Sequence, residues 1–453
     1  MVRLREGWRR LLGTLWFIPS VIVIGAIGLA IGMVELSTRI DGHALARWPL
    51  IFGATADSSR AMLSAIASGM ITVAGLTFSL TVVAVTQASS QFTPRILRNF
   101  MSDRPNQLVL GTFVGIFAYC LVVLRTIRSV AERTFVPSLA VFLGIVLAIL
   151  GIAVLIYFVH HIASTLQASN IVARVAQDTF GTIDVLFPHD VDDEADDAKY
   201  DESRVVMQRA GEIDHWRAVS SPQTGYIQGV DVDALVAAAC DAHGVIRMDC
   251  GPGDFVVGKT LLASVGDGTT QPGATHKLDR RIARAYTIGK YRTVDEDVAF
   301  GLRQLVDISL RALSPGVNDT TTAVTCVDYI GAILVRLAPR RIDCPAREVD
   351  GEMRVVVRGP SFESLLRLAV DEIRQNSGGN VTVLARMMEI LIQVASRTAS
   401  PSRLQLIKEQ VMLLKEVAGR TVPAVYDADR LRALSTRAQS AAERDSSRSS
   451  SHM

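Results

Sequence analysis

Cysteine is scarce in this 453-residue sequence, and its five cysteines lie far apart. No C-x-x-C pair is present, which argues against a disulfide framework and suits a reducing compartment. The spacing Cys240-x-x-His243 with Cys250 resembles a set of metal ligands, but a fourth ligand is missing and the first pair falls on an apolar helix. We therefore expect no metal site and no cofactor.

Enzyme signatures are also missing. The sequence has no G-x-S-x-G elbow, H-E-x-x-H pair, dinucleotide fingerprint or kinase motif set. The acidic residues Asp295, Glu296 and Asp297 fall in the first turn of a predicted helix, where the helix dipole alone favours carboxylates. A membrane enzyme that uses them with Asn318 and Asp319 is thus weakly supported, and we predict no catalytic residue. A net charge of +2 gives no reason to expect a nucleic-acid partner.

Charge is absent from the middle of four long apolar segments near the N-terminus. They cover residues about 12–35, 62–86, 107–127 and 136–160. Because about 20 apolar residues in a helix span a bilayer core, the sequence predicts a four-helix transmembrane domain over 1–173. Glu35 and Arg125 lie only at segment ends, which disfavours a coupled pump, since pumps bury ionisable groups at mid-membrane depth.

Two of these segments exceed what a membrane requires. The stretch between Arg60 and Arg95 has about 34 residues without charge, and the stretch between Arg133 and Arg174 has about 40. We expect both helices to continue beyond the bilayer as cytoplasmic extensions.

Flanking positive charge favours cytoplasmic termini, although by a small margin that the free cysteines support. The first segment has about two dozen residues, more than a secretory signal core, so we interpret it as a retained span. With the N-terminus inside, the cytoplasmic side carries Arg3, Arg5, Arg9, Arg10, Arg95, Arg98 and Arg104. The opposite side carries Arg39, Arg47, Arg60, Arg125, Arg128 and Arg133. We predict a multi-pass protein of the bacterial inner membrane whose N- and C-termini are cytoplasmic.

The second apolar segment carries small and hydroxyl side chains on one helical face, within about 80° of one another at 100° per residue. This stripe consists of Ser64, Ser68, Thr72, Gly75, Ser79, Thr86 and Ser90. Close helix–helix packing explains it, and Gly28-x-x-x-Gly32 and Gly111-x-x-x-Gly115 in neighbouring segments support that interpretation. The alternative is a water-accessible pathway lined by one such helix from each subunit of a homo-oligomer.

The rest of the chain predicts a soluble α+β domain. Its expected parts are a connector with an acidic linker over 174–204, a small β-rich module over 205–290, a mostly helical domain over 291–433 and a disordered tail over 434–453. The run of acidic residues at about 189–204 has no apolar periodicity and is typical of a solvated linker.

The β-rich module is indicated by short alternating runs separated by Gly and Pro. They are Trp216–Val219, Tyr226–Val230, Val245–Met248 and Phe255–Val257, with a helix at Val232–His243. The module also contains the phosphate-loop pattern from Gly253 to Gly258-Lys259-Thr260. Its interior is stiff and β-forming and no long helix follows, so we predict a tight turn between two strands.

The helical domain is indicated by capping and periodicity. Thr293-x-x-Glu296 predicts a capping box for a helix through about Leu313, and a second helix is expected from Thr320 to about Leu337. The polar turn between them either caps both helices or binds an ion or anion through Ser314, Asn318, Asp319 and Thr320. A hairpin at Glu348–Arg358 and helices at about 361–376, 380–398, 401–418 and 427–443 follow.

Three motifs resemble a bacterial family of predicted membrane proteins catalogued as a domain of unknown function. They are Ile71-Thr72-Val73-Ala74-Gly75-Leu76, Ser90-Gln91-Phe92-Thr93-Pro94-Arg95-Ile96-Leu97 and Ala312-Leu313-Ser314-Pro315-Gly316-Val317-Asn318-Asp319. The resemblance implies a four-span membrane part followed by a cytoplasmic domain, and it implies no particular activity.

Two functional hypotheses follow from these patterns. The first is a homo-oligomeric channel-like protein that passively conducts ions or small solutes under the control of a cytoplasmic domain. The second is a membrane-anchored sensor or scaffold whose soluble domain binds a metabolite or partner protein.

Overall fold

The computed structural model describes residues 16–39, 55–91, 104–130, 133–165, 167–187, 213, 215–266, 272–342 and 346–449. The chain forms two compact units, the first ending at Asn170 and the second beginning at Ile171. The predicted acidic linker at about 189–204 and the motif from Phe92 to Leu97 lie outside the described residues.

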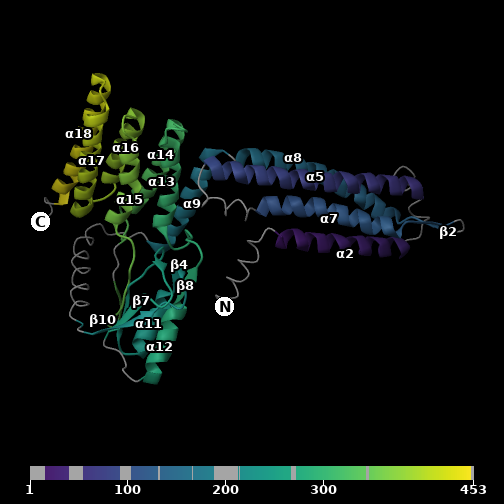
Figure 1. Cartoon of the computed structure of the whole chain (residues 1–453), viewed down its shortest axis with the longest axis horizontal. Helices are drawn as coiled ribbons and strands as arrows, with labels where there is room; N and C mark the ends of the chain where they lie inside the picture. The colour runs from purple at the N-terminus through teal and green to yellow at the C-terminus, as the bar shows by residue number, and fades with distance from the viewer. Residues whose placement is uncertain are drawn as a thin grey trace. The chain divides into compact units, whose positions relative to one another are not determined.

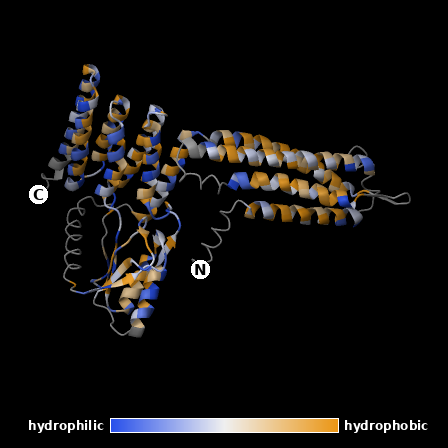
Figure 2. Cartoon of the chain, in the orientation of Figure 1, coloured by the Kyte–Doolittle hydropathy of each residue, from blue (hydrophilic) through white to orange (hydrophobic). Residues whose placement is uncertain are grey.

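The described residues of the first unit form four long helices and a short hairpin (Figure 1). The helices are α2 (Phe17–Arg39), α5 (Ala56–Gln91), α7 (Arg104–Thr126) and α8 (Ser138–Thr165), and the hairpin strands are β1 (Arg128–Val130) and β2 (Arg133–Phe135). Apolar residues predominate along all four helices (Figure 2). The second and fourth helices are as long as their charge-free stretches predicted, since α5 extends through Gln91 and α8 through Thr165.

The four helices alternate in direction. A Cβ atom on Gly111 of α7 would lie 2.7 Å from the Ile22 side chain of α2, and one on Gly115 would lie 3.4 Å from Ala26, so α2 and α7 run parallel. Helix α5 runs antiparallel to α7, because Arg60 near its start donates a 3.0 Å hydrogen bond to the carbonyl of Ile127 just beyond the α7 C-terminus. The motif Gly111-x-x-x-Gly115 therefore serves the close helix packing that its spacing predicted.

Helix α8 runs parallel to α5. A Cβ atom on Gly144 would lie 2.9 Å from Leu63, and one on Gly151 would lie 3.1 Å from the sulfur of Met70. With α2 and α7 in one direction and α5 and α8 in the other, the start of α2 and the end of α8 lie on the same side of this unit.

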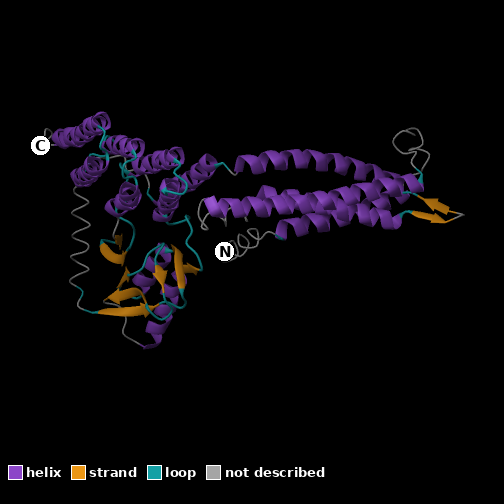
Figure 3. Cartoon of the chain, turned by 45° about the horizontal axis from the view of Figure 1, so that its top comes forward, coloured by secondary structure: helices purple, strands orange, loops and turns teal. Residues whose placement is uncertain are grey.

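The strands of the second unit form two sheets (Figure 3). The strands are β3 (Trp216–Ser220), β4 (Gly225–Val230), β5 (Val245–Met248), β6 (Phe255–Val256), β7 (Leu261–Gly266), β8 (Tyr286–Gly289), β9 (Ala346–Val349) and β10 (Glu352–Val356). One sheet has the order β3-β7-β5-β10-β9 and the other the order β6-β4-β8. Helices α11 (Val232–Asp241) and α12 (Pro272–Ala285) contribute Leu235 and Ile282 to their shared apolar core.

The remaining helices form three successive hairpins in chain order, α13–α14, α15–α16 and α17–α18 (Figure 1). In the second hairpin, α15 and α16 contact helices of the neighbouring hairpins more than each other. Their bounds are α13 (Val298–Leu313), α14 (Thr320–Leu337), α15 (Phe362–Asn376), α16 (Val381–Ala395), α17 (Pro401–Thr421) and α18 (Val425–Ser449). Helices α13, α15 and α17 contact one another in order, and so do α14, α16 and α18. This stacking of two-helix units resembles that of helical repeat proteins. Helix α9 (Ala168–Leu186) packs on the first hairpin through contacts described below.

The predicted elements of the second unit are largely confirmed. The four β runs, the helix after Val232, the turn at Asp350-Gly351 and the helices of the three hairpins are all present. Strand β7 follows the turn that was predicted to join two strands, whereas helix α12 and strand β8 were not predicted. Strands β9 and β10 form the predicted hairpin, but they join the sheet of the β-rich module, where Val355 pairs with Ile246, and not the mostly helical domain to which 291–433 was assigned.

Two expectations are wrong. Helix α13 does not begin with the capping box Thr293-x-x-Glu296, because Asp297 is its N-cap and accepts a hydrogen bond from the amide of Phe300. The stretch from residue 434, expected to be disordered, is helical in α18 as far as Ser449. Its Leu434, Ala438 and Ala442 are buried, and this apolar contact offsets the weak helix propensity of the serines nearby.

Candidate functional site

The small hydroxyl stripe of α5 lies on the face that the other helices of the first unit leave uncovered. The face of α5 that packs inward carries Leu63, Ala67, Ala74 and Thr77, each 4% exposed or less. At 100° per residue, the centre of the stripe is about 140° from the centre of that buried face. The stripe residues Ser64, Ser68, Thr72, Gly75, Ser79 and Thr86 are all exposed, and Ser90 lies in the helix without a described side chain.

The glycines of this unit are of two kinds, those in close contact with another helix and those without a neighbouring helix. Gly111 and Gly115 contact α2 closely, whereas no described atom lies within 4 Å of a Cβ built on Gly75, Gly28 or Gly32. Packing against the chain's own helices therefore explains the first pair and does not explain the stripe. The hydroxyls of Thr72 and Thr86 bond to carbonyls of their own helix, which leaves a smooth outer face of modest polarity.

The polar turn between α13 and α14 uses its polar groups internally. The carboxylate of Asp319 accepts hydrogen bonds from the amide (3.0 Å) and the hydroxyl (2.6 Å) of Thr322, which caps α14 and lowers the pKa of Asp319. Asn318 adopts φ 49°, which Asn tolerates better than most residues. Ser314 donates to the carbonyl of Arg311, and Thr320 accepts from Asn380, the N-cap of α16. These bonds join two capped helix starts, as the capping interpretation expects.

The acidic segment at Asp295–Asp297 lies where the β-rich module meets α13. Glu296 accepts a 2.9 Å hydrogen bond from the amide of Val230, and a Cβ atom on Gly229 would lie 2.8 Å from the Glu296 carboxylate. Burial raises the pKa of Glu296. This carboxylate thus bonds to strand β4 and not to the start of its own helix, which explains why the predicted capping box does not form.

Asp297 is 4% exposed in its side chain and pairs with Arg292 at 2.7 Å. Burial raises its pKa, although Arg292 and the amide of Phe300 act in the opposite direction. Gly253 has φ +90°, and a Cβ atom there would collide with the carboxylate of Asp297. The glycine is therefore needed both for its backbone conformation and for the close approach of α13.

The residues of the enzyme hypothesis are not brought together. Asp295–Asp297 precede α13 and Asn318–Asp319 follow it, so a helix of 16 residues, about 24 Å long, separates the two groups. Each group serves a separate helix start.

The phosphate-loop pattern forms the turn between β6 and β7 that the sequence predicts. Lys259 has φ 69°, its amide bonds to the carbonyl of Ser221, and the amide of Gly258 bonds to the hydroxyl of Thr224. The loop amides are thereby used within the fold. In the described part of the chain, no group of three His, Cys, Asp or Glu side chains could hold a metal ion, and Cys240, His243 and Cys250 form no such group.

Sequence analysis missed the residues that hold α9 against α13 and α14. Arg340 is 2% exposed and donates to the carbonyls of Ile183 (3.0 Å) and Phe187 (2.6 Å) at the C-terminus of α9. It also pairs with Asp184 at 2.6 Å, and Arg336 pairs with the same carboxylate at 2.5 Å. Bonding to Arg336 is the largest cause of a lowered pKa at Asp184. No local sequence pattern connects positions more than 150 residues apart.

Close packing accompanies these polar bonds along α9. The hydroxyl of Thr182 donates to the carbonyl of Val294 at 2.8 Å. Thr179 occupies the space beside Gly301 of α13, where a Cβ atom would collide with it. Helix α9 is thus part of the second unit from Ile171 onward, and it follows α8 in the chain.

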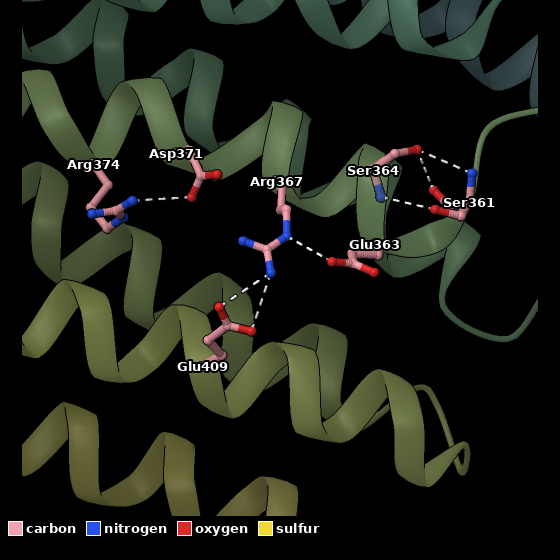
Figure 4. A network of polar contacts seen from close by, with 7 residues as sticks. All are labelled: Ser361, Glu363, Ser364, Arg367, Asp371, Arg374 and Glu409. Atoms are coloured by element: carbon pink, nitrogen blue, oxygen red, sulfur yellow. Dashed lines mark hydrogen bonds and ion pairs between the residues drawn. The ribbon is translucent and has the colours of Figure 1, made fainter.

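Arginine–carboxylate pairs also connect successive hairpins. Arg303 of α13 binds Glu372 of α15, and Arg386 of α16 binds Asp328 of α14. Figure 4 shows the next connection, in which Arg367 of α15 reaches Glu363 of its own helix at 2.9 Å and Glu409 of α17 at 3.2 Å. These pairs are partly exposed, so each contributes modestly, and their regular placement fixes how neighbouring hairpins align.

Long apolar helices define the class of this protein. In the described residues five helices are long and apolar enough to cross a membrane, namely α2, α5, α7, α8 and α14. The chain is a membrane protein with transmembrane helices and a second unit that combines helices and strands.

The chain belongs to the family described as "Predicted membrane protein (DUF2254)", whose profile matches residues 13–393. It is 34% identical over 411 residues to the uncharacterized proteins Mb1321c of Mycobacterium bovis and Rv1290c of Mycobacterium tuberculosis. The match covers 90% of this chain and 77% of each relative. No solved structure matches the chain. The family resemblance stated from the sequence motifs is therefore confirmed.

Proposed function

We propose that the chain is the subunit of a homo-oligomeric channel-like membrane protein that passively conducts ions or small solutes, with the second unit as its cytoplasmic regulatory domain. The observation that carries this proposal is the uncovered hydroxyl-rich face of α5. A helix that faces lipid alone gains nothing from a long row of Ser, Thr and Gly, because lipid offers no hydrogen-bond partners. A row of this kind is expected where a second copy packs closely or where water is present.

The membrane topology of the proposal uses four spans. Helices α2, α5, α7 and α8 belong to the first unit and are the most apolar of the five candidates. Helix α14 contacts α13 and α16, and it carries Asp328 and Arg336 in ion pairs. Charged pairs of this kind are costly in hydrocarbon, so α14 is assigned to the soluble part.

The orientation follows from the helix directions and the flanking arginines. The start of α2 and the end of α8 share one side, and the arginines before α2 make that side the cytoplasmic one in a bacterial inner membrane. The absence of acidic or basic residues in the middle of the four spans is compatible with a passive conduit and disfavours a coupled pump.

Conduction is the direct test of the proposal. Purified protein in liposomes is expected to pass small ions or solutes, and Ser79→Phe is expected to abolish the flux by filling the stripe face with a bulky ring. Leu80→Phe is the matched control, since Leu80 is the next residue on the same helix, is 39% exposed and points away from the stripe. Equal flux in Ser79→Phe and wild type would remove the stripe from any pathway.

The number of subunits tests the same proposal independently. A monomer or dimer in detergent leaves little room for a central pathway between α5 helices. In an assembly around α5, Ser79→Cys is expected to give disulfide-linked subunits on mild oxidation, whereas a cysteine at the exposed Ile149 of α8 is not. The native Cys120 and Cys326 are buried but Cys240 and Cys250 are partly exposed, so wild type under the same oxidation gives the background.

A membrane-anchored sensor is the second candidate, and the attachment of α9 favours it. Any ligand that rearranges the helical hairpins would act on α9, which is bonded to Arg336 of α14 and to Arg340 just beyond it and follows α8 in the chain. This candidate predicts that some metabolite or partner raises the melting temperature of the second unit while the liposomes show no conduction. A metabolite library without any such effect would count against it.

A further inference from the structure

Helix α12 of the β-rich module carries a concentration of positive charge. Its sequence from Pro272 to Ala285 contains one lysine, three arginines and one histidine, and Asp279 is its single acidic residue. Asp279 pairs with Arg217 of β3 at 2.7 Å, and Arg281 pairs with Asp241 of α11 at 2.7 Å. These two ion pairs account for the acid and for one of the arginines.

The other basic side chains of α12 project from one face of the helix. His276, Lys277, Arg280 and Arg284 are all exposed, and they lie within about 100° of one another at 100° per residue. None of them pairs with a carboxylate of another described residue. The opposite side of the helix enters the apolar core of the module, as at Ile282. These four residues are the basic face of α12.

Like charges this close together destabilise a helix unless an anion compensates them. Arg280 and Arg284 are four residues apart and Lys277 and Arg280 are three apart, which are the spacings at which side chains of one helix face each other. The arginines that connect the helical hairpins avoid this cost, since Arg303 and Arg386, for example, each bind a carboxylate of a neighbouring helix. The net charge of the chain is only +2, so the excess on α12 is local. The basic face is therefore suited to an anion presented from outside the chain.

A membrane surface presents such anions to this chain. Only two residues separate the end of α8 at Thr165 from the start of α9 at Ala168, and α9 is bonded to the second unit through Arg340. A short tether of this kind gives the second unit a high effective concentration for lipid. Anionic lipids attract Lys and Arg, each of which strengthens binding by about fivefold, and the guanidinium of Arg matches the geometry of a phosphate group.

We propose that the basic face of α12 binds anionic phospholipid headgroups at the membrane surface. The contact is electrostatic, because the face has no aromatic or long aliphatic side chain that could enter the hydrocarbon. Its lysine and two arginines together are expected to favour the bound state by a factor on the order of 100 at low salt, and by less at high salt. The proposal needs only that the first unit lies in a bilayer, so it does not rest on conduction.

Chemical labelling of lysine amines in the full chain tests this contact. In lipid nanodiscs that contain phosphatidylglycerol, Lys277 is expected to react several-fold more slowly than in nanodiscs of phosphatidylcholine alone, because a bound headgroup shields its ammonium. Lys415, exposed on α17, is the internal control and is expected to react equally in both lipids. High salt is expected to remove the protection of Lys277. Equal reaction of Lys277 in the two lipids at low salt would overturn the proposal.

Two double variants locate the contact on the helix. Arg280→Gln with Arg284→Gln is expected to restore most of the reactivity of Lys277, and glutamine keeps the helix propensity of arginine. The matched control is Arg430→Gln with Arg437→Gln, which removes the same charge from exposed positions of α18 and is expected to leave Lys277 protected. Equal release of Lys277 by the two double variants would mean that total charge attracts the lipid, and it would refute the basic face as the site.

A soluble polyanion is the competing partner, and the same labelling separates it from lipid. An oligonucleotide added to phosphatidylcholine nanodiscs is expected to leave Lys277 reactive. Protection by the oligonucleotide without protection by phosphatidylglycerol would assign the basic face to nucleic acid and overturn the lipid proposal. Because no flux is measured, a chain that does not conduct can still show lipid-dependent protection, and the two proposals fail separately.

Discussion

The two units of this chain build similar helices and hold them together in different ways. In the first unit α2 and α7 approach through Gly111 and Gly115, and the polar stripe of α5 faces outward. In the second unit α9 and the hairpins are joined by arginine–carboxylate pairs over apolar cores, as at Arg340 and Asp184. Between helices in lipid there is no hydrophobic gain, so close backbone approach matters most, whereas in water apolar burial and ion pairs act together.

The largest expected effect is the loss of the buried guanidinium in the second unit. Arg340→Met leaves the carbonyls of Ile183 and Phe187 without their donor and the Asp184 carboxylate with one partner fewer. We expect the free energy of unfolding of the segment around α9 to fall by about 3 kcal/mol, the lower end for breaking a buried pair, because Asp184 is partly exposed. Amide hydrogen exchange along α9 and α14 measures this change.

The exposed Arg397 is the matched control, and Arg397→Met is expected to leave exchange in α9 unchanged. If Arg340→Met increased exchange to the same degree in the first unit, the stability of that unit would depend on interactions in the second unit.

A smaller effect is expected from crowding the contact between α9 and α13. Gly301→Ala places a methyl group against Thr179, which is expected to cost about 1–3 kcal/mol through overpacking. Gly181→Ala, on α9 itself, meets no atom within 4 Å and is expected to stabilise the helix by up to about 1 kcal/mol. Chemical denaturation of the two variants measures the difference, and equal stability would mean that α9 is not closely packed on α13.

The corresponding comparison in the first unit uses Gly111 and Gly75. Gly111→Ala meets the backbone of Pro19 at 2.9 Å, so its crowding outweighs the gain in helix propensity and we expect a net loss of about 1 kcal/mol. Gly75→Ala has open space within one chain and is expected to leave the monomer's melting temperature unchanged or slightly higher.

The same Gly75→Ala variant also tests whether copies of the chain pack against one another along the stripe. If copies pack along the stripe, its association in detergent is expected to weaken even though the single chain is not destabilised. Analytical ultracentrifugation separates the two effects, and unchanged association would place the stripe outside the contact between subunits.

The smallest expected effect is the pH dependence of a helix cap in the second unit. Bonding from Thr322 lowers the pKa of Asp319 below its ordinary value of 3.8. The stabilisation by its charge is therefore fully present above that value and is lost as the pH falls through the lowered pKa. Asp319→Asn keeps a capping oxygen without the titration, and we expect it to be less stable than wild type by less than about 1 kcal/mol at neutral pH.

That difference between Asp319→Asn and wild type is expected to disappear as the pH falls through the lowered pKa of Asp319. Urea denaturation at several pH values provides the measurement. A difference that stays constant with pH would show that the charge of Asp319 contributes nothing to the stability of α14.

Local patterns predicted most of the helices and strands but few of the contacts between them. The charge-free stretches predicted the long α5 and α8, and alternation with Gly and Pro predicted β3 to β6. The start of α13 was misplaced because Thr293 and Glu296 match a capping box locally, while strand β4 offers Glu296 a better partner. The position of β10 beside β5 depends on pairing across about 110 residues, which local patterns do not specify.

The candidate site, too, was predicted from the sequence only in part. The spacing of the stripe residues is a property of one helix, so it could be found without a structure. Whether other helices cover that stripe depends on the packing of α2, α7 and α8. Arg340 resembles any surface arginine in the sequence, and it becomes a buried cap only because α9 ends beside α14.

The sequence by itself determined that the protein enters a membrane, because hydrocarbon rejects charge and accepts only long stretches of apolar residues in helical form. It also determined the helices and strands whose periodicity reflects a buried and an exposed face. Tertiary structure alone decided which face of α5 is covered and how α9 is bonded. These depend on contacts between distant residues, and the energy of such a contact has no local signature.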